Sequence, residues 1–486
     1  MPTSCGRTWE APPRPPRSAA PEDGTPHVAV VGGGITGLAT AWYLRAATSP
    51  APPTVTVLEA DDRLGGKIRT EELGGVPVEA GPDTFLGRVP WARELCRELG
   101  MEGELVAPAT SKAWLWRSGR LRPLPAGTVL GVPVTVGSLA PGRALSPAGT
   151  ARATLDLVLP RRPLPDDPSV ADLVGARMGR EVVDRLVDPL VGGIHAGRAD
   201  RLSLRSTAPP LAEAAVRRRS LILALRSRER EVDGGPLFLG VSGGLERLVG
   251  RLASALERTD VRLGTTAGAL SGGGGNRWRL ECEPGPAVEA DAVVLAVPAA
   301  AAAGVLSEVA PAVADELRHI RYASVVVTTL AYRPAAVPSA LDGSGFLVPR
   351  SEGRLITACT WSTSKWPQLG ASGLVVLRAS AGRDGDERAL GMDDDALVSA
   401  LHRELTTMVG VTEPPTTSRV DRWPASFPQY EPGHDDRVGR IEAALAADTP
   451  GVFVAGAAYR GLGIAACVQQ GRAVAERALG GIMGSG

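Results

Sequence analysis

The sequence has few cysteines, few aromatic residues and almost no lysine. Its five cysteines are scattered over 486 residues and form no CxxC pair, which argues against a disulfide framework or a zinc site and for a reducing compartment. Only three of the 53 basic residues are lysine, at positions 67, 112 and 365, and 53 acidic residues balance them. A net charge of zero argues against nucleic acid as a partner.

Long hydrophobic runs are also missing. The longest candidate, residues 292–306, is interrupted by Pro298 and is shorter than the roughly 18 residues of a membrane-spanning helix. Residues 1–26 are rich in proline, alanine and arginine without an apolar core, so we expect a disordered tail rather than a signal peptide. We therefore expect a cytoplasmic protein without a transmembrane segment, and peripheral membrane contact stays open.

A glycine-rich loop lies between a predicted strand and a predicted helix near the start of the chain. In the stretch VVGGGITGLAT, at 30–40, Gly32, Gly34 and Gly37 fit the pattern GxGxxG. In that pattern the glycines allow a tight turn, a close approach of the backbone to a pyrophosphate, and close packing of helix on strand. The phosphates then lie at the helix N-terminus.

The next predicted strand ends in an acid, Glu59, 22 positions after Gly37. A carboxylate there suits a ribose diol and repels a 2′-phosphate, which leaves FAD or NAD(H). The following segment, EADDRLGGKIRT, resembles the second flavin signature of glutathione-reductase-type flavoproteins, through Glu59, Arg63, Gly65, Gly66 and Lys67. The resemblance favours FAD.

Nucleotide-domain signals recur at the start, the middle and the end of the chain. FLGVSGGLERLVGRL begins at Phe238 with another strand–turn–helix pattern, and a glycine-led helix begins near Gly463. We expect an α/β protein with a Rossmann-like FAD-binding domain assembled from three segments, an inserted mixed-sheet substrate domain and a mostly helical subdomain. The predicted FAD domain spans 27–80, 235–299 and 447–486, the substrate domain 81–88, 190–234 and 300–446, and the helical subdomain 89–189.

Longer motifs identify a family. The stretches EAGPDTF (79–85), DPLVGGIHAGRADRLSLRS (188–206), ITACTWSTSKWP (356–367), WPASFPQYEPGH (423–434) and GLGIAACVQQGRAVAE (461–476) resemble oxygen-dependent protoporphyrinogen and coproporphyrinogen oxidases within the FAD-dependent amine-oxidase-like superfamily. ITACTWSTSKW most resembles the bacterial soluble branch, which oxidises coproporphyrinogen III. The resemblance implies an FAD enzyme of haem biosynthesis that removes six electrons from a porphyrinogen, uses dioxygen and releases hydrogen peroxide.

The resemblance also implies which residues hold FAD. They lie in the glycine loop, after the second predicted strand, in EAGPDTF, in the middle segment and near the C-terminal helix. The set is Gly32, Gly33, Gly34, Ile35, Thr36, Gly37, Glu59, Ala60, Arg63, Gly66, Lys67, Gly81, Pro82, Asp83, Thr84, Ala267, Trp423, Leu462, Gly463 and Ile464.

No side chain is identified as a catalytic group, and no metal site is expected, because the five histidines are dispersed. In such an oxidation the flavin accepts a hydride, and the pyrrole N–H proton that becomes acidic is lost readily, so no strong dedicated base is needed. Arg88, Arg350 and Lys365 are candidate anchors for the carboxylates of the substrate. Further partners would be dioxygen and a downstream ferrochelatase, and the protein would be a monomer or a homodimer.

Three alternatives remain open. Protoporphyrinogen IX could be the substrate instead. An amine oxidase or a carotenoid-desaturase-like enzyme would share the fold and the cofactor. A non-catalytic binding protein similar to Rab GDP-dissociation inhibitors would share the fold without using flavin, and a colourless purified protein would favour that alternative.

Overall fold

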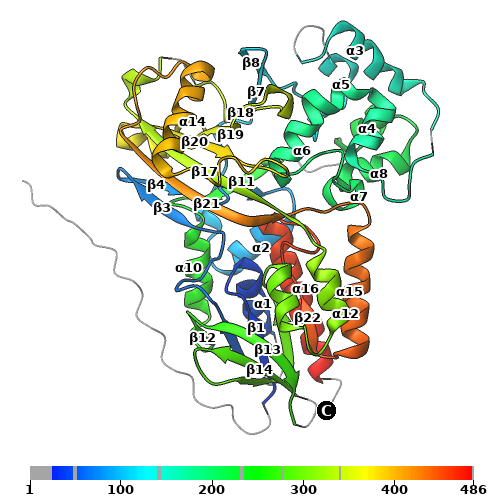
Figure 1. The fold of residues 1–486 in the computed structure, drawn as a ribbon, viewed down its shortest axis with the longest axis vertical. Coiled ribbons are helices and arrows are strands. Elements are labelled where there is room, and N and C mark those ends of the chain that lie inside the picture. The colour runs from blue at the N-terminus through cyan, green and yellow to red at the C-terminus, as the bar shows by residue number, and fades with distance from the viewer. Residues whose placement is uncertain are drawn as a thin grey trace, which may run out of the picture.

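The computed structural model describes residues 25–47, 52–139, 144–161, 163–229, 235–274, 277–338 and 341–483. A lower half is built around a parallel sheet, and an upper half contains a larger mixed sheet with a group of helices beside it (Figure 1). Of the predicted N-terminal tail, residues 1–24 lie outside the described residues.

The lower half contains a five-stranded parallel sheet in the order β12-β2-β1-β16-β22. Val28, Ala29 and Val30 in the central strand are fully buried, as expected for a strand covered on both faces. Parallel strands end at one edge of the sheet, where α/β proteins bind their ligands. The strands are β1 (His27–Val31), β2 (Thr54–Leu58), β12 (Asp260–Arg262), β16 (Ala292–Leu295) and β22 (Val452–Val454).

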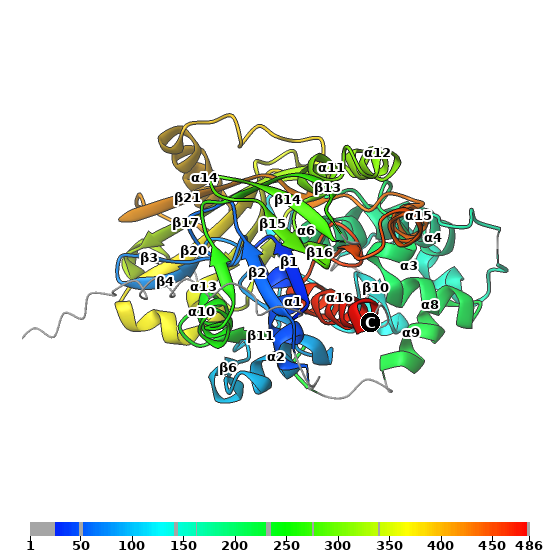
Figure 2. The ribbon, with the colours of Figure 1, turned by 90° about the horizontal axis from the view of Figure 1, so that it is seen from below.

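Two layers cover this sheet. The helices α1 (Ile35–Ala46), α2 (Pro90–Glu98), α10 (Glu246–Ala255) and α16 (Ile464–Met483) pack on one face. The other face carries a three-stranded sheet of β13 (Thr266–Gly272), β14 (Trp278–Glu283) and β15 (Val288–Ala290), together with α11 (Ala299–Val305), α12 (Pro311–Arg318) and α15 (His434–Asp448). Figure 2 shows the parallel strands between these layers.

The upper half contains a seven-stranded sheet in the order β21-β17-β20-β19-β18-β7-β8, in which β18 and β7 are parallel and the other neighbours antiparallel. α14 (Asp394–Val409) covers one face, and the Asp393 side chain caps its N-terminus by accepting from Ala396 N–H at 2.8 Å. The strands are β7 (Trp114–Arg117), β8 (Arg120–Pro123), β17 (Tyr322–Tyr332), β18 (Gly345–Leu347), β19 (Ile356–Trp361), β20 (Val375–Ala381) and β21 (Thr417–Pro428).

The position of β7 and β8 differs from the sequence-based expectation. Both strands fall within 89–189, which we expected to be mostly helical, yet they extend the sheet of the upper half. The run WLWRSGRLRP is a hairpin, and Phe346 of β18 pairs with Trp114 of β7. The pairing partner lies more than 200 residues away, so the local pattern alone did not reveal this sheet.

Beside this sheet lies a group of short helices with its own core. A buried ion pair joins Arg177 to Asp156, with 2.8 Å between Nε and Oδ1, and Asp156 also accepts from the Ser220 hydroxyl and Ile222 N–H. The pair is therefore fully hydrogen-bonded. The helices are α3 (Pro147–Thr154), α4 (Val170–Met178), α5 (Arg180–Val182), α6 (Asp188–His195), α7 (Leu204–Thr207), α8 (Pro209–Arg217) and α9 (Leu221–Glu229), with a π-helical turn at Val183–Val187.

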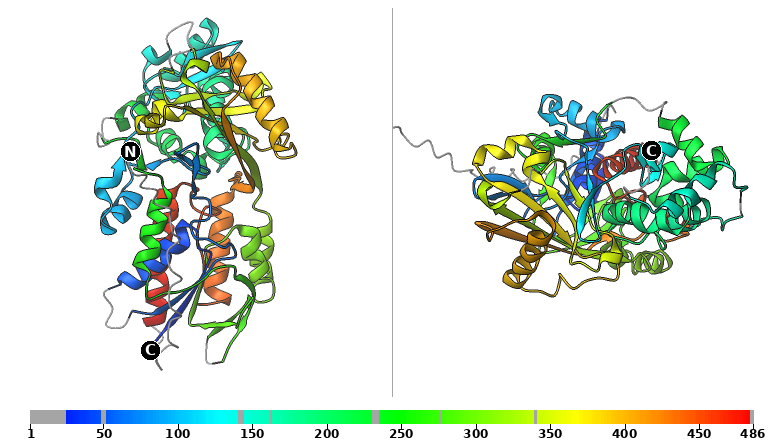
Figure 3. Two further views of the ribbon diagram at one scale, coloured as in Figure 1. Left: turned by 90° about the vertical axis from the view of Figure 1, so that its left-hand side faces the viewer. Right: turned by 90° about the horizontal axis from the view of Figure 1, so that it is seen from above.

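Short strands join the two halves. β11 (Phe238–Val241) pairs with β5 (Phe85–Leu86) and β6 (Leu105–Val106), and β3 (Thr70–Leu73) pairs with β4 (Val76–Glu79). A further hairpin is β9 (Thr128–Val129) with β10 (Val132–Pro133). Figure 3 shows the two halves from the side and from above. Among the described residues, no helix combines the length and the apolar character needed to cross a membrane.

Candidate active site

The turn after β1 is made by three glycines in distinct environments. Gly32 has φ +105°, and a Cβ on it would lie 2.6 Å from the Ala296 carbonyl oxygen. A Cβ on Gly37, in the first turn of α1, would lie 1.9 Å from the Gly32 carbonyl oxygen. These two positions therefore require glycine, one for the backbone conformation and one for close packing of helix on strand.

Gly34 differs from its neighbours because a Cβ there would meet nothing within 4 Å. Its backbone faces open space, and the first-turn N–H groups of α1 have no acceptor within their own helix. An anion at this position gains several N–H donors and the positive end of the helix dipole. The loop therefore fits a pyrophosphate.

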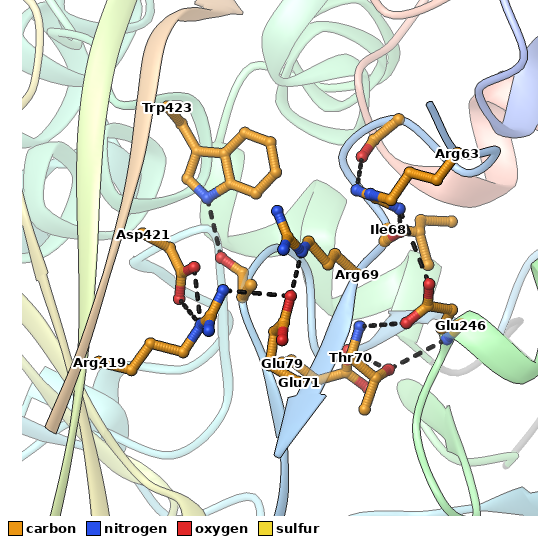
Figure 4. A network of polar contacts seen from close by, with 12 residues as sticks. Arg63, Ile68, Arg69, Thr70, Glu71, Glu79, Glu246, Arg419, Asp421 and Trp423 are labelled. Atoms are coloured by element: carbon orange, nitrogen blue, oxygen red, sulfur yellow. Dashed lines mark hydrogen bonds and ion pairs between the residues drawn. The ribbon is translucent and has the colours of Figure 1, made fainter. Parts of the chain in front are cut away.

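A second glycine loop, residues 63–67, lies directly against the first. Gly65 N–H donates to the Gly33 carbonyl at 2.9 Å, and a Cβ on Gly66 would lie 3.4 Å from Gly34 Cα. Arg63 shapes this loop, because its guanidinium donates to the carbonyls of Leu64 and Gly66 at 3.0 and 2.6 Å. It also donates to the Ile68 carbonyl at 3.2 Å, and Figure 4 shows these two residues. Arg63 therefore holds the backbone of the loop.

Glu59 lies beneath the first loop. Its carboxylate accepts from Gly33 N–H at 2.6 Å and from Asp61 N–H at 2.9 Å. The Glu59 carbonyl accepts from Thr265 N–H at 2.8 Å, which brings the start of β13, including Ala267, beside the residues that follow β2. Glu59 and the residue two positions before Ala267 are therefore direct neighbours.

The segment 80–84 touches the second loop and the long strand β21. A Cβ on Gly81 would lie 1.9 Å from the Lys67 carbonyl oxygen, and Trp423 Nε1 donates to the Ala80 carbonyl at 2.8 Å. Arg378 of β20 donates to the Gly81 carbonyl. Lys67 reaches the Ser426 carbonyl, and burial lowers the pKa of its ammonium.

Asp83 and Lys365 form a nearly buried ion pair, with 2.6 Å between Oδ2 and Nζ and side chains 16% and 12% exposed. Burial acts to raise the pKa of Asp83, but the nearby Lys365 and Arg378 outweigh it and hold the pKa below its usual value. Asp83, which lies between Pro82 and Thr84, therefore neutralises the charge of Lys365.

Glu79 accepts from Leu245 N–H at 2.7 Å. It also accepts from the Thr70 hydroxyl at 3.0 Å, and both residues appear in Figure 4. Burial raises the pKa of Glu79 to about 7, against the lowering effect of these hydrogen bonds and of Arg378. A cavity of about 190 Å³ opens beside Glu79 and Asp83 and is also lined by Trp366.

The N-terminus of α16 presents a second open backbone position. A Cβ on Gly463 would meet nothing within 4 Å, and Leu462 and Ile464 flank it. The Tyr430 hydroxyl donates to the Ala457 carbonyl and accepts from Gly461 N–H at 3.1 Å, so it fixes the segment before the helix. The Gln470 side chain accepts from the N–H groups of residues 456 and 460, at 3.2 and 3.3 Å.

The helices α1 and α16 set the spacing between the two open positions. A Cβ on Gly471 would lie 2.7 Å from the Thr36 carbonyl oxygen, so the two helix backbones touch. Ile464 begins α16 about 10 Å, or two helical turns, before Gly471. The N-terminus of α16 therefore lies beyond that of α1, towards the upper half (Figure 1).

The three candidate anchors for carboxylates lie apart and are each engaged. Arg88 is exposed, and its Nε donates to the Gly235 carbonyl at 3.1 Å. Arg350 donates to the carbonyls of Asp384 and Gly197, both at 3.1 Å. Lys365 is paired with Asp83. The structure does not bring the three side chains together.

The sequence matches the family of flavin-containing amine oxidoreductases over residues 35–479. The chain belongs to this family. It is 37% identical to a coproporphyrinogen III oxidase from Bacillus subtilis (strain 168), over 94% of this chain and 98% of that protein. It is 39% identical to a coproporphyrinogen III oxidase from Mycobacterium tuberculosis (strain H37Rv), over 92% and 96% of the two chains. The crystal structure of a protein from Exiguobacterium sp. 255-15, described as a protoporphyrinogen oxidase, superposes with a TM-score of 0.83 at 32% identity. The superposition covers 93% of this chain and 98% of that chain.

As a member of the flavin-containing amine oxidoreductases, the chain is an oxidoreductase with FAD as its cofactor, and its α/β fold is that of the family. Gly34 and Gly463 thus leave open backbone at the N-termini of two helices, α1 and α16. Sequence reasoning missed Arg378, Tyr430 and Gln470, which brace the loops around this site. For Arg378 the only signal is the alternation along β20, which places it opposite the buried Leu377 and Ala379.

Proposed function

We propose that this protein oxidises coproporphyrinogen III to coproporphyrin III in three two-electron steps, with dioxygen as the electron acceptor and hydrogen peroxide as the second product. The observation that carries the proposal is the named activity of the Bacillus and Mycobacterium relatives, which align with nearly the whole chain. The site agrees with it, because no acid–base or metal chemistry is needed once a flavin is bound.

The proposed cofactor contacts use the backbone more than side chains. The pyrophosphate would lie on the turn of Gly32–Gly37 and the second loop, the ribose on Glu59, and the flavin ring between 81–84, Trp423 and the N-terminus of α16. The C-terminal contacts would come from residues 462–464. The positive end of α16 would stabilise negative charge on the reduced ring. When bound, the flavin supplies the hydride acceptor for a two-electron oxidation.

The protein's own contribution would be to hold a flat, apolar substrate against that ring. On the sheet of the upper half, Ala323, Val325 and Val327 of β17 form a buried cluster with Ala196, and Trp423 and Phe427 pack against it. We call this the apolar wall. The partly buried Trp423 and Phe427, backed by this cluster, would offer an apolar surface to a tetrapyrrole, with its carboxylates at the edge of the site.

The domain organisation belongs to the same proposal. The three segments 27–80, 235–299 and 447–486 would form the FAD domain, because β1 and β2, then β12 and β16, and finally β22 enter one parallel sheet in that order. The inserted residues would form the substrate and helical domains. A cytoplasmic location, a ferrochelatase that takes the product and a monomer or homodimer complete this proposal.

Aerobic turnover tests the function directly. Purified flavin-replete protein should convert coproporphyrinogen III to fluorescent coproporphyrin III and release three molecules of hydrogen peroxide per porphyrin. The same assay with protoporphyrinogen IX measures the preference between a tetracarboxylate and a dicarboxylate. A flavin-replete protein that oxidises neither porphyrinogen would disprove the proposal, and a preference for protoporphyrinogen IX would correct the substrate.

A further inference from the structure

Arg383 is an almost fully buried arginine for which the described residues provide no hydrogen-bond or ion-pair acceptor. The residue follows β20, in a turn where Gly382 has φ +90°, and only 9% of it is exposed. Its Nε is completely enclosed and has no partner. By contrast, the buried Arg177 in the helical group satisfies its guanidinium on Asp156 and nearby carbonyls.

Three carboxylates lie around Arg383, and none of them forms a direct ion pair with it. Asp188 attracts Arg383 from a distance and accepts from Ala199 N–H at 2.9 Å, and the other two are paired with other arginines. Asp384 accepts from Arg321 at 2.6 Å, and Asp386 pairs with Arg388 at 2.8 Å. Arg350, next to Arg383, donates its two terminal nitrogens to backbone carbonyls, and its own Nε is enclosed without an acceptor. Two neighbouring guanidinium groups therefore lack a direct ion-pair partner.

An isolated buried cation costs folding free energy unless an anion accompanies it. Burial, together with the nearby Arg350, lowers the pKa of Arg383. The lowered pKa means that the surroundings disfavour the charged form of this side chain. An arginine nevertheless stays protonated at any ordinary pH. A counter-ion from outside the chain would remove the cost.

Arg383 lies at one end of the proposed substrate site. Asp384 N–H donates to the Ala196 carbonyl at 2.6 Å, and Ala196 belongs to the apolar wall. Five residues earlier on the same chain, Arg378 donates to the Gly81 carbonyl of the proposed flavin loop. An extended chain of that length spans at most about 17 Å. In the pairing of β17 with β20, Thr329 lies opposite Arg378 and Val327 of the apolar wall lies opposite Ser380. The wall therefore runs from beside Arg378 towards the turn that carries Arg383.

We propose that Arg383, with Arg350 beside it, binds one carboxylate of the substrate. This inference rests on the proposed function, in which the substrate is a flat tetrapyrrole with four carboxylate arms. A guanidinium binds a planar carboxylate through two parallel hydrogen bonds, and the bond is strongest where water is excluded. Arg350 positions the site and adds positive charge, because its terminal donors are occupied by the backbone.

The test compares Arg383→Gln and Arg383→Lys with the wild-type holoenzyme. For coproporphyrinogen III, we expect Arg383→Gln to raise KM about 10- to 100-fold and to leave kcat within about twofold, because a charge-assisted contact to substrate is lost. Arg383→Lys should recover part of the loss, because lysine keeps the positive charge but lacks the two parallel N–H donors of a guanidinium. The dissociation constant of coproporphyrin III, from quenching of protein fluorescence, should rise by the same factor as KM.

Two controls separate binding from structure. Arg333→Gln changes an exposed arginine that pairs with Glu413 and lies at the opposite end of the β17–β20 pair from Arg383, and it should leave KM unchanged. The tetramethyl ester of coproporphyrin III, which lacks the charges, should bind wild type and Arg383→Gln equally. The melting temperature of Arg383→Gln should stay equal to that of wild type or rise, because no native bond of this side chain is lost.

The outcomes distinguish this inference from the proposed function. Equal affinity of wild type and Arg383→Gln for coproporphyrin III would overturn the carboxylate site, whether or not the wild type turns over. A lower melting temperature with unchanged KM would likewise overturn it, because Arg383 would then be structural. Failure of the wild type to oxidise coproporphyrinogen III would overturn the proposed function separately.

Discussion

The two halves of this protein prepare their binding surfaces in different ways. In the lower half, backbone meets backbone: Gly34, Gly65 and Gly463 leave peptide groups open to a ligand or in contact with each other. In the upper half, side chains do the positioning, and Arg378 and Lys365 reach from the large sheet and its connections to the loop at 81–84. Where a ligand contacts the backbone, replacing the glycine with a larger residue should abolish binding. Where a side chain holds a loop, its substitution should cost only part of the stability or affinity. The predictions below test this difference.

The largest effect is expected at Gly34. Gly34→Val would place a branched side chain in the space that faces the helix N-terminus, so the protein should purify without flavin and show no oxidised-flavin absorbance. Gly250→Val is the matched control, because Gly250 in α10 also faces open space but lies outside both loops. Full flavin retention in Gly34→Val would show that 30–40 is not the phosphate loop.

The next prediction tests whether Lys365 holds the loop at 81–84 through Asp83 or anchors the substrate. Lys365→Met would leave Asp83 buried without its partner and should cost about 1.5–3 kcal/mol of unfolding free energy, measured by denaturant titration. The double variant Asp83→Asn with Lys365→Met should recover part of this loss. If Lys365 were instead a substrate anchor, Lys365→Met would raise KM without a change in stability, and the second substitution would not compensate.

A smaller effect is expected at Tyr430. Tyr430→Phe removes the hydroxyl that bonds residues 457 and 461 but keeps the ring stacked on His434, with 4.1 Å between centroids. The expected loss is about 0.5–1.5 kcal/mol, seen as weaker FAD affinity in a reconstitution titration. Tyr322→Phe removes a comparable bond, to Ala299 N–H at 2.9 Å. Equal loss of FAD affinity in both variants would contradict a specific role for Tyr430.

The most gradual effect is a pH dependence from Glu79, which is spread over several pH units. Burial raises its pKa from 4.5 to about 7, so between these values the folded state binds the proton more tightly than the unfolded state. Stability should therefore fall as the pH rises from 4.5 to 7, by at most about 1.4 kcal/mol per pH unit from this group. Glu79→Gln should remove this part of the slope in thermal melts, and parallel curves for the two proteins would argue against the raised pKa.

The sequence revealed the backbone surfaces better than the side-chain braces. The turn after β1 and the helix start at Ile464 were predictable, because glycine spacing and strand–helix order are local signals. The direct contact of Arg378 with Gly81 and the pairing of β7 with β18 were not, because each joins residues more than 200 positions apart. Arg63 was predicted as a flavin ligand, and its three bonds to loop carbonyls indicate how it would act indirectly.

The backbone contact between Gly471 and Thr36 fixes the distance between the N-termini of α1 and α16, which are the two proposed contact points for the cofactor. One helix end faces the proposed phosphate position and the other the proposed ring position, and neither helix can slide without separating the pair. Inserting or deleting one residue between Ile464 and Gly471 would turn the α16 N-terminus by about 100° and carry Gly463 away from the proposed ring position. The distance between the two ends of a dinucleotide bound as proposed would therefore be set by packed helices rather than by the loops that touch it.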